Sequence, residues 1–287
     1  VSGWIQDTPY KRKNFSRIIA ISEMVKKDLM HWYQIPEERI TIVYNGVDIE
    51  RFHPRNRQYR EEIRKRHGIS GDELVILFVS NNVRMKGLDF LIKALAEVKE
   101  EEHLPFKLLV LGRDRKEPYL HLGKKLGISE KVVFAGSTNE PEKYYGASDF
   151  LVHPTFYDAC SLTVLEALAS GLPVITTFSN GAGGIVTQGQ EGFVISDPRE
   201  ERILIEKMSF LLNREQFLAS PIKSSSLRTV FENSSTIAMG LKNLLSGTYR
   251  SKRRAMAVMM VMSVSICSRI PGRCTFTITR LPSMSLA

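Results

Sequence analysis

Short runs of apolar residues, each about as long as a β-strand, recur along the chain from residue 17 to residue 196. They are apolar throughout, which is typical of strands buried on both faces of a parallel sheet. Segments with the apolar spacing of amphipathic helices separate most of them. The pattern predicts an α/β fold with a doubly wound parallel sheet. The expected strands are residues 17–22, 39–44, 74–80, 107–112, 131–136, 149–154, 173–177 and 192–196, with helices such as 88–99 and 118–126 between them.

The predicted strands fall into two groups along the chain. Residues 1–52 contain a strand, a helix at residues 23–33 and a second strand. The strand at residues 17–22 has the pattern of a buried strand that needs partners on both sides, as in a larger sheet. We predict that this piece is the C-terminal remnant of a second Rossmann-like domain, truncated upstream of Val1. Residues 53–72 are predicted to be a connecting segment with a helix, and residues 73–220 to form one doubly wound domain.

The net charge of +9 is concentrated at the end of the chain. Residues 221–287 contain ten Lys or Arg side chains and one acid, whereas the rest is neutral, with 30 basic and 30 acidic side chains. A neutral body gives no electrostatic reason to expect a nucleic-acid partner. Residues 221–287 also lack helical or strand periodicity, so we predict a basic tail that is disordered or aberrant. A basic arm for anionic surfaces is the alternative.

Cysteine usage and hydropathy favour a cytoplasmic protein. Cys160, Cys267 and Cys274 are too few and too unevenly spaced for a disulfide framework or a paired metal motif. No apolar run reaches the roughly 18 residues of a membrane span, and the N-terminus lacks the plan of a signal peptide. The expected location is the cytoplasm. A peripheral contact at the inner face of the membrane could form through the part of the second domain upstream of Val1.

Residues 153–177 combine a strand, a loop, a helix and a second strand. Gly171 and Pro173 mark the end of the helix, which we place at residues 162–170. The first turn of a helix carries unsatisfied N–H groups and the positive end of the helix dipole. We therefore predict a phosphate site at this turn, formed by the backbone amides of Ser161, Leu162 and Thr163.

Two carboxylates, Asp158 and Glu166, flank the start of this helix. Glu166 lies about five residues into the helix and therefore roughly 7 Å along its axis, so the pair can contact different parts of one elongated ligand. In the alternative interpretation, Asp158 is a helix cap and Glu166 a solvated helix residue. For both together, in this setting, we favour the ligand-binding interpretation.

Basic side chains follow the first strand of the predicted domain. Arg84 and Lys86 lie in its strand-to-helix loop, where a guanidinium and an ammonium can bind a diphosphate and stabilise its charge as it leaves. The loop Gly112-Arg113-Asp114 follows a neighbouring strand and could line a base or ribose pocket, although we favour a plain turn there. His153 and Cys160 are interpreted as structural residues.

Several metal and phosphate motifs are missing from the sequence. It contains no Asp-x-Asp pair, no Gly-x-x-x-x-Gly-Lys loop and no His-Glu-x-x-His. We therefore predict no metal site and no cofactor. Arg84, Lys86 and backbone amides would have to neutralise a bound diphosphate.

These residues, in this order, resemble the retaining glycosyltransferases with two Rossmann domains (GT-B, family 4 type), which include the lipopolysaccharide core glucosyltransferases. The resemblance covers about residues 17–197 and rests on four motifs: residues 17–22, residues 38–48, Arg84-x-Lys86-Gly87 and the spacing from Asp158 to Glu166. It implies that Asp158 contacts the transferred sugar, Glu166 the ribose hydroxyls, and Arg84 and Lys86 the diphosphate. Two positions depart from the family pattern: Asp158 stands where Glu is usual, and Ser161 where Gly is common.

The sequence hypothesis is therefore a hexosyltransferase that uses a nucleotide diphosphate sugar and retains the anomeric configuration. Its expected partners are the nucleotide-sugar donor and a glycan or lipid-linked acceptor, as in lipopolysaccharide or cell-surface polysaccharide synthesis. Two alternatives stay open: a donor-binding fragment without catalytic activity, and a sugar-nucleotide epimerase or phosphorylase on the same fold.

Overall fold

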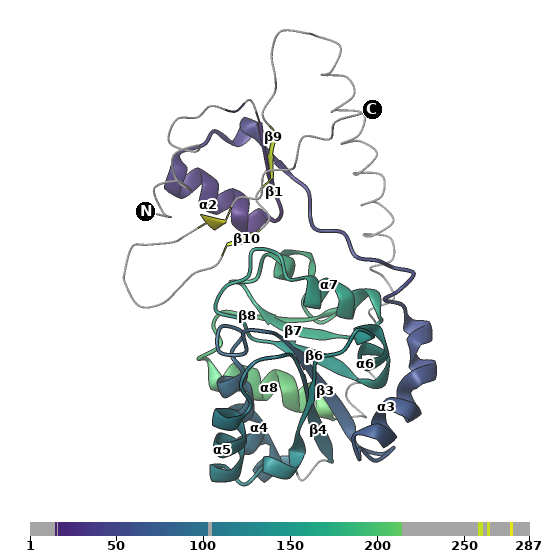
Figure 1. Cartoon of the computed structure of the whole chain (residues 1–287). Coiled ribbons are helices and arrows are strands. Elements are labelled where there is room, and N and C mark those ends of the chain that lie inside the picture. The colour runs from purple at the N-terminus through teal and green to yellow at the C-terminus, as the bar shows by residue number, and fades with distance from the viewer. Residues whose placement is uncertain are drawn as a thin grey trace.

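The computed structural model describes residues 15, 17–102, 105–213, 258–260, 263–264 and 276–277. Most of these residues form one large α/β unit, and a smaller group at the start of the chain packs above it (Figure 1). The large unit contains the strands β3 (Leu74–Val79), β4 (Phe106–Leu111), β5 (Val132–Gly136), β6 (Phe150–His153), β7 (Val174–Thr177) and β8 (Gly192–Ile195). Its helices are α3 (Arg60–Arg66), α4 (Leu88–Glu102), α5 (Glu117–Lys125), α6 (Pro141–Ala147), α7 (Leu162–Ala169) and α8 (Glu201–Leu212).

The six strands of the large unit form one parallel sheet in the order β5-β4-β3-β6-β7-β8. The chain proceeds outward from β3 in one direction through β4 and β5, then returns to β6 and proceeds in the other direction. β3 and β6 are neighbours, with Leu77 aligned with Leu151. In sheets of this kind the strand order reverses at such a pair, and a crevice opens outside their carboxyl ends.

Helices cover both faces of the sheet, as its apolar strands require. On one face α4, α5 and α8 enclose a cluster that includes Phe78, Leu95, Phe106 and Met208. On the other face α3, α6 and α7 pack over Val75, Leu77, Leu109 and Leu151 (Figure 1). Alternate residues of β3 thus belong to different clusters, because successive side chains of a strand point to opposite faces.

The smaller group consists of β1 (Arg17–Ala20), α2 (Glu23–Tyr33) and β2 (Ile40–Ile42), with the 3-10 helix η1 (Glu37–Arg39) between the last two. β1 pairs in parallel with β2. Ser22 caps α2 by accepting a hydrogen bond from the amide of Val25. The apolar residues of this group join the core of the large unit on its α7 face, so one cluster spans both.

The segment at residues 53–72 is packed rather than extended. The 3-10 helix η2 (Pro54–Tyr59) and α3 lie against α6. Two further 3-10 helices, η3 (Ser129–Lys131) and η4 (Gly181–Ile185), precede β5 and follow β7. None of the helices in the described ranges is both long enough and apolar enough to cross a bilayer.

The predicted fold class is confirmed: the sheet is parallel, doubly wound and built from the expected strands. α6 and α8 were not predicted individually. α6 has only seven residues, too few to show a helical period. α8 does carry the signal, because Leu204, Ile205, Met208, Leu211 and Leu212 recur at helical spacing and are buried. The domain boundaries at residues 52, 72 and 220 stay predictions.

Most of residues 221–287 lie outside the described residues. The structure places three short strands there: β9 (Val258–Met260), β10 (Ser263–Val264) and β11 (Phe276–Thr277). β9 pairs in parallel with β1, and β10 pairs with β11. These strands differ from the expectation of a tail without strands. Four of their residues, Val258, Val264, Phe276 and Thr277, are of types that are enriched in strands. For the other residues of the tail the prediction lies outside the described part of the chain.

Candidate functional site

The predicted site residues come from the loops that follow β3 and β6. Lys86 lies in the loop between β3 and α4, and Asp158 lies in the loop between β6 and α7. The two loops meet at the carboxyl ends of these neighbouring strands, where the Phe156 amide of one donates to the Met85 carbonyl oxygen of the other at 3.0 Å. Ligands of doubly wound folds bind at this position.

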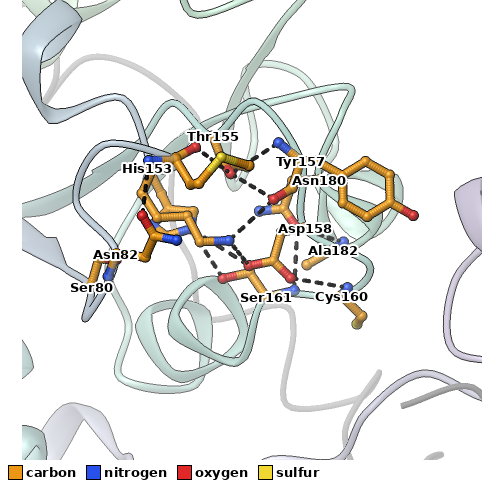
Figure 2. A network of polar contacts seen from close by, with 12 residues as sticks. Ser80, Asn82, His153, Thr155, Tyr157, Asp158, Cys160, Ser161, Asn180 and Ala182 are labelled. Carbon is orange, nitrogen blue, oxygen red and sulfur yellow. Dashed lines mark hydrogen bonds and ion pairs between the residues drawn. The ribbon is translucent and has the colours of Figure 1, made fainter. Parts of the chain in front are cut away.

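Lys86 and Asp158 form an ion pair in the crevice. The Lys86 Nζ lies 2.6 Å from the Asp158 Oδ2 and also donates to the carbonyl oxygen of Tyr157 at 3.2 Å. Both side chains are about one-fifth exposed, so the pair is accessible to a ligand yet shielded from bulk water. Asp158 is at the centre of a polar network that also includes His153, Ser161 and Asn180 (Figure 2).

His153 is buried next to Asp158, with 1% of its side chain exposed. Its Nε2 is 3.8 Å from the Asp158 Oδ2 and 3.4 Å from the Ser161 Oγ. Burial lowers the pKa of His153, so the ring is neutral at pH 7. Burial raises the pKa of Asp158, but His153 and Lys86 lower it more, and its net pKa lies well below the usual range. Asp158 is therefore an anion throughout the physiological range.

The start of α7 differs in one respect from the sequence prediction. The Ser161 amide is not free for a phosphate, because it donates to the Asn180 Oδ1 at 3.2 Å, and Ser161 is 3% exposed. The same oxygen accepts from the Ala182 amide, and the Asn180 Nδ2 donates to the Thr176 Oγ1. The amides of Leu162 and Thr163 lie one and two positions further on, and within the described residues no side chain caps this helix.

Glu166 lies within α7 and is partly buried. Its Oε2 accepts a hydrogen bond of 2.8 Å from the hydroxyl of Tyr145. Burial raises the pKa of Glu166, although Tyr145 and Arg51 oppose the rise. Neither carboxylate fits the alternative interpretation. Asp158 bonds the Cys160 amide rather than an amide of α7, and Glu166 is not simply solvated.

The Arg84 side chain does not lie beside the Lys86 side chain in this structure. It is exposed and lines a hollow between α4 and α5, together with Asp89, Lys93, Tyr119, Leu122 and Lys125. Lys86 points instead across the crevice to Asp158. Their joint contact with a diphosphate stays a prediction.

The loop Gly112-Arg113-Asp114 supports the loop that carries Lys86. The Asp114 Oδ2 accepts from the Val83 amide at 3.0 Å, and the Arg113 amide donates to the Asn81 Oδ1 at 3.1 Å. A Cβ at Gly112 would lie 1.8 Å from the Ser80 carbonyl oxygen, so only glycine allows the two loops to approach this closely.

Side chains from the smaller group brace the loop that carries Asp158. The Ser22 Oγ donates to the Ala159 carbonyl at 2.7 Å, and the Asn45 Nδ2 donates to the Cys160 carbonyl at 3.0 Å. The Tyr157 hydroxyl donates to the Asp28 Oδ2 at 3.3 Å. Sequence reasoning missed these contacts and also Asn180, because they join residues that are distant in sequence. Cys160 is packed as expected, and burial raises its thiol pKa to about 11.

We expect Gly87→Ala to destabilise the protein by about 1–3 kcal/mol, the range for a strained backbone position. Gly87 has a φ of +75°, and a Cβ there would lie 2.3 Å from the Pro154 carbonyl oxygen. Gly68 is a matched control, because its φ is +63° but no atom lies within 4 Å of an added Cβ. Urea unfolding of both variants measures the difference. Equal losses would show that the contact between the Lys86 loop and Pro154 contributes nothing.

Comparison with known proteins decides the family. The family model described as "Glycosyl transferases group 1" matches residues 59–227, and "Glycosyltransferase Family 4" matches residues 4–51. The chain belongs to the group 1 glycosyltransferases. The first match covers the described large unit, including Lys86, Asp158 and Glu166, and the second covers the smaller group.

Relatives of this glycosyltransferase chain come from archaea and bacteria. An uncharacterised glycosyltransferase of Methanocaldococcus jannaschii, MJ1607, is 31% identical over 181 residues, which are 61% of this chain and 46% of that protein. The lipopolysaccharide glucosyltransferase WaaG of Escherichia coli is 27% identical over 75% of this chain and 56% of its own length. The chain thus spans about half the length of the curated relatives that it matches.

Solved structures agree with the fold. The crystal structure of WaaG, a glycosyltransferase involved in lipopolysaccharide biosynthesis, matches with a TM-score of 0.65 over 75% of this chain and 60% of that one. Anabaena Alr3699/HepE in complex with UDP-glucose has a TM-score of 0.67 over 81% of this chain and 64% of its own, at 22% identity. The similarity to the Anabaena protein is evidence for a shared fold.

Proposed function

We propose that the chain binds a nucleotide diphosphate sugar across the carboxyl ends of β3 and β6, for transfer of its hexose to an acceptor hydroxyl. The observation that carries the proposal is the Lys86–Asp158 ion pair at 2.6 Å, located beside the start of α7. This site offers a cation, an anion and helix amides that no side chain caps within the described residues. Such groups match a ligand that has a diphosphate at one end and sugar hydroxyls next to it.

Each group has a proposed role. The Lys86 ammonium and the amides of Leu162 and Thr163 hold the diphosphate and stabilise its charge as it leaves. Asp158 accepts hydrogen bonds from the hydroxyls of the transferred sugar, and its low pKa keeps it an acceptor. Glu166 lies more than one helical turn from the start of α7 and accepts hydrogen bonds from the ribose hydroxyls.

The proposed reaction retains the configuration of the sugar and needs no metal. In this proposal Lys86 and the helix amides take the place of a metal ion, and Asp158 already has a cation as its partner. The protein's main contributions would then be positioning of the donor and stabilisation of the leaving group.

The proposed acceptor is a glycan or lipid-linked sugar at the inner face of a membrane. The name of the Escherichia coli relative, a lipopolysaccharide glucosyltransferase, supports this class of acceptor. The proposed location is the cytoplasm, with peripheral contact to the membrane surface that carries such an acceptor.

A second candidate function is donor binding without transfer. It is favoured by the origin of the site residues, because Lys86, Asp158 and Glu166 all belong to the large unit and each is proposed to contact the donor. A transferase must hold an acceptor hydroxyl in attack geometry as well as the donor, and orientation contributes roughly 7–11 kcal/mol in well-positioned reactions. Donor binding without product would identify this candidate. Transfer to a hydroxyl with retention would identify the first.

Calorimetry with UDP-glucose, GDP-mannose and ADP-glucose tests the donor proposal. We expect one of them to bind, with the same affinity in EDTA as in magnesium, because Lys86 and helix amides neutralise the diphosphate. Binding that disappears in EDTA would contradict the metal-free site. No binding of any of the three would contradict the donor site itself.

A further inference from the structure

Tyr145 is a buried aromatic residue next to the proposed ribose-binding carboxylate. It belongs to α6 and is 1% exposed, with its ring packed edge-on against Phe52 at 5.5 Å. Its hydroxyl lies 2.8 Å from the Glu166 Oε2 and 3.3 Å from the Thr163 carbonyl oxygen. The hydroxyl therefore contacts two residues of α7, one of which carries a proposed phosphate-binding amide.

The Tyr145 hydroxyl stays protonated at neutral pH and donates a hydrogen bond to Glu166. Burial, together with the negative charge of Glu166, raises the pKa of Tyr145 far above its usual value. A phenol that stays protonated is a permanent donor, and a hydrogen bond to a carboxylate is about twice as strong as one between neutral groups.

This contact selects one orientation of the Glu166 carboxylate. A glutamate side chain has three rotatable torsions, and fixing one carboxylate oxygen removes much of that freedom before a ligand arrives. Oε2 is held by the phenol, whereas within the described residues no hydrogen bond to Oε1 is found. Oε1 thus remains available to a ligand hydroxyl, with its direction set by the bond on the other oxygen.

We propose that Tyr145 is a positioning residue, which orients Glu166 for contact with the ribose hydroxyls of the donor. This inference rests on the proposed function, because it assumes that Glu166 contacts the ribose. It adds a residue from a different helix to the recognition of the nucleotide. The consequence is that the preference for ribose over deoxyribose depends on a buried phenol that does not touch the ligand.

Tyr144 provides a matched control in the next position of α6. It is 4% exposed, and its hydroxyl interacts with the His67 Nε2 at 3.2 Å rather than with Glu166. Tyr144→Phe and Tyr145→Phe each remove one buried hydroxyl and keep the ring. A general loss of stability therefore affects both variants, whereas a loss of carboxylate orientation affects Tyr145→Phe.

The test compares UDP, GDP and ADP with their 2′-deoxy counterparts by calorimetry, in the wild type and three variants. For the diphosphate that binds tightest, we expect the wild type to prefer the ribose form by about tenfold, which corresponds to one charge-assisted hydrogen bond. In Tyr145→Phe the preference should fall to about threefold or less, and in Glu166→Ala it should disappear. Tyr144→Phe should keep the preference of the wild type.

The outcomes separate the inference from the proposed function. A preference retained in Tyr145→Phe but lost in Glu166→Ala would overturn the positioning role and leave the function standing. An equal fall in Tyr144→Phe would also overturn the role, because the effect would then be a general consequence of removing a hydroxyl from α6. A preference that survives Glu166→Ala, or no binding of any diphosphate, would overturn the proposed contact with ribose and this inference with it.

Discussion

Replacement of Asp149 by alanine is expected to lower the free energy of unfolding by about 3–5 kcal/mol, the usual cost of removing one partner from a buried ion pair. Asp149 immediately precedes β6, and its two oxygens bind Arg60 at 2.7 Å and Arg64 at 2.8 Å. It also accepts from the Val75 amide of β3 at 2.7 Å. Arg64 is 4% exposed, so the change leaves a buried guanidinium without its anion.

Glu62→Ala is the control for this prediction. Glu62 pairs with Arg66 on the same helix, α3, but both side chains are about half exposed. Such surface pairs contribute about 0–1 kcal/mol. Urea unfolding should therefore give a much larger loss for Asp149→Ala. A loss below about 1 kcal/mol for both variants would show that the Asp149 network does not join α3 to the sheet.

Lys86→Ala should weaken binding of the nucleotide sugar by about 1.5–3 kcal/mol, or roughly 10- to 100-fold in the dissociation constant. The change removes the ammonium that would contact the diphosphate. It also removes the cation that lies 2.6 Å from the Asp158 carboxylate, so this carboxylate would repel the diphosphate of the donor. Calorimetry of the variant with the donor that binds the wild type measures the effect.

Substitution of two other cations, Lys93 and Arg84, shows whether the loss is specific to Lys86 or a general effect of removing a positive charge. Lys93 lines the hollow between α4 and α5, so Lys93→Ala should leave binding unchanged. Arg84→Ala tests the sequence prediction that both loop cations contact the diphosphate. A loss similar to that of Lys86→Ala would support this prediction. Unchanged affinity in Lys86→Ala would contradict the role given to the ion pair.

The sheet could be predicted from the sequence because each of its strands contains a run of apolar residues. The sequence also places the loop with Lys86 and the loop with Asp158 at one edge of the sheet, since the carboxyl ends of parallel strands share an edge. The ion pair between the two side chains was not predicted. The helix at residues 162–170 ends one residue earlier in the structure, at Ala169. Its end could be located because Gly171 and Pro173 do not continue a helix.

The contacts that complete the site could not be predicted. Asn180 binds the Ser161 amide across 19 positions, and Ser22 binds the Ala159 carbonyl across 137. No local pattern encodes a hydrogen bond between residues that only the packed sheet brings together. The direction of the Arg84 side chain could not be predicted either, because the position of a residue in a loop does not determine where its side chain points.

Hydrogen exchange of the whole chain, with and without the best-binding donor, tests most directly whether the crevice between β3 and β6 is the donor site. The amides of Leu162 and Thr163 begin α7 with no side-chain cap among the described residues, and those of the Lys86 loop lie opposite. We expect added donor to slow exchange at residues 82–88 and 159–164, and to leave α8 on the far side of the sheet unchanged. Slower exchange confined to other parts of the chain, or no change at saturating donor, would contradict the assignment of this crevice.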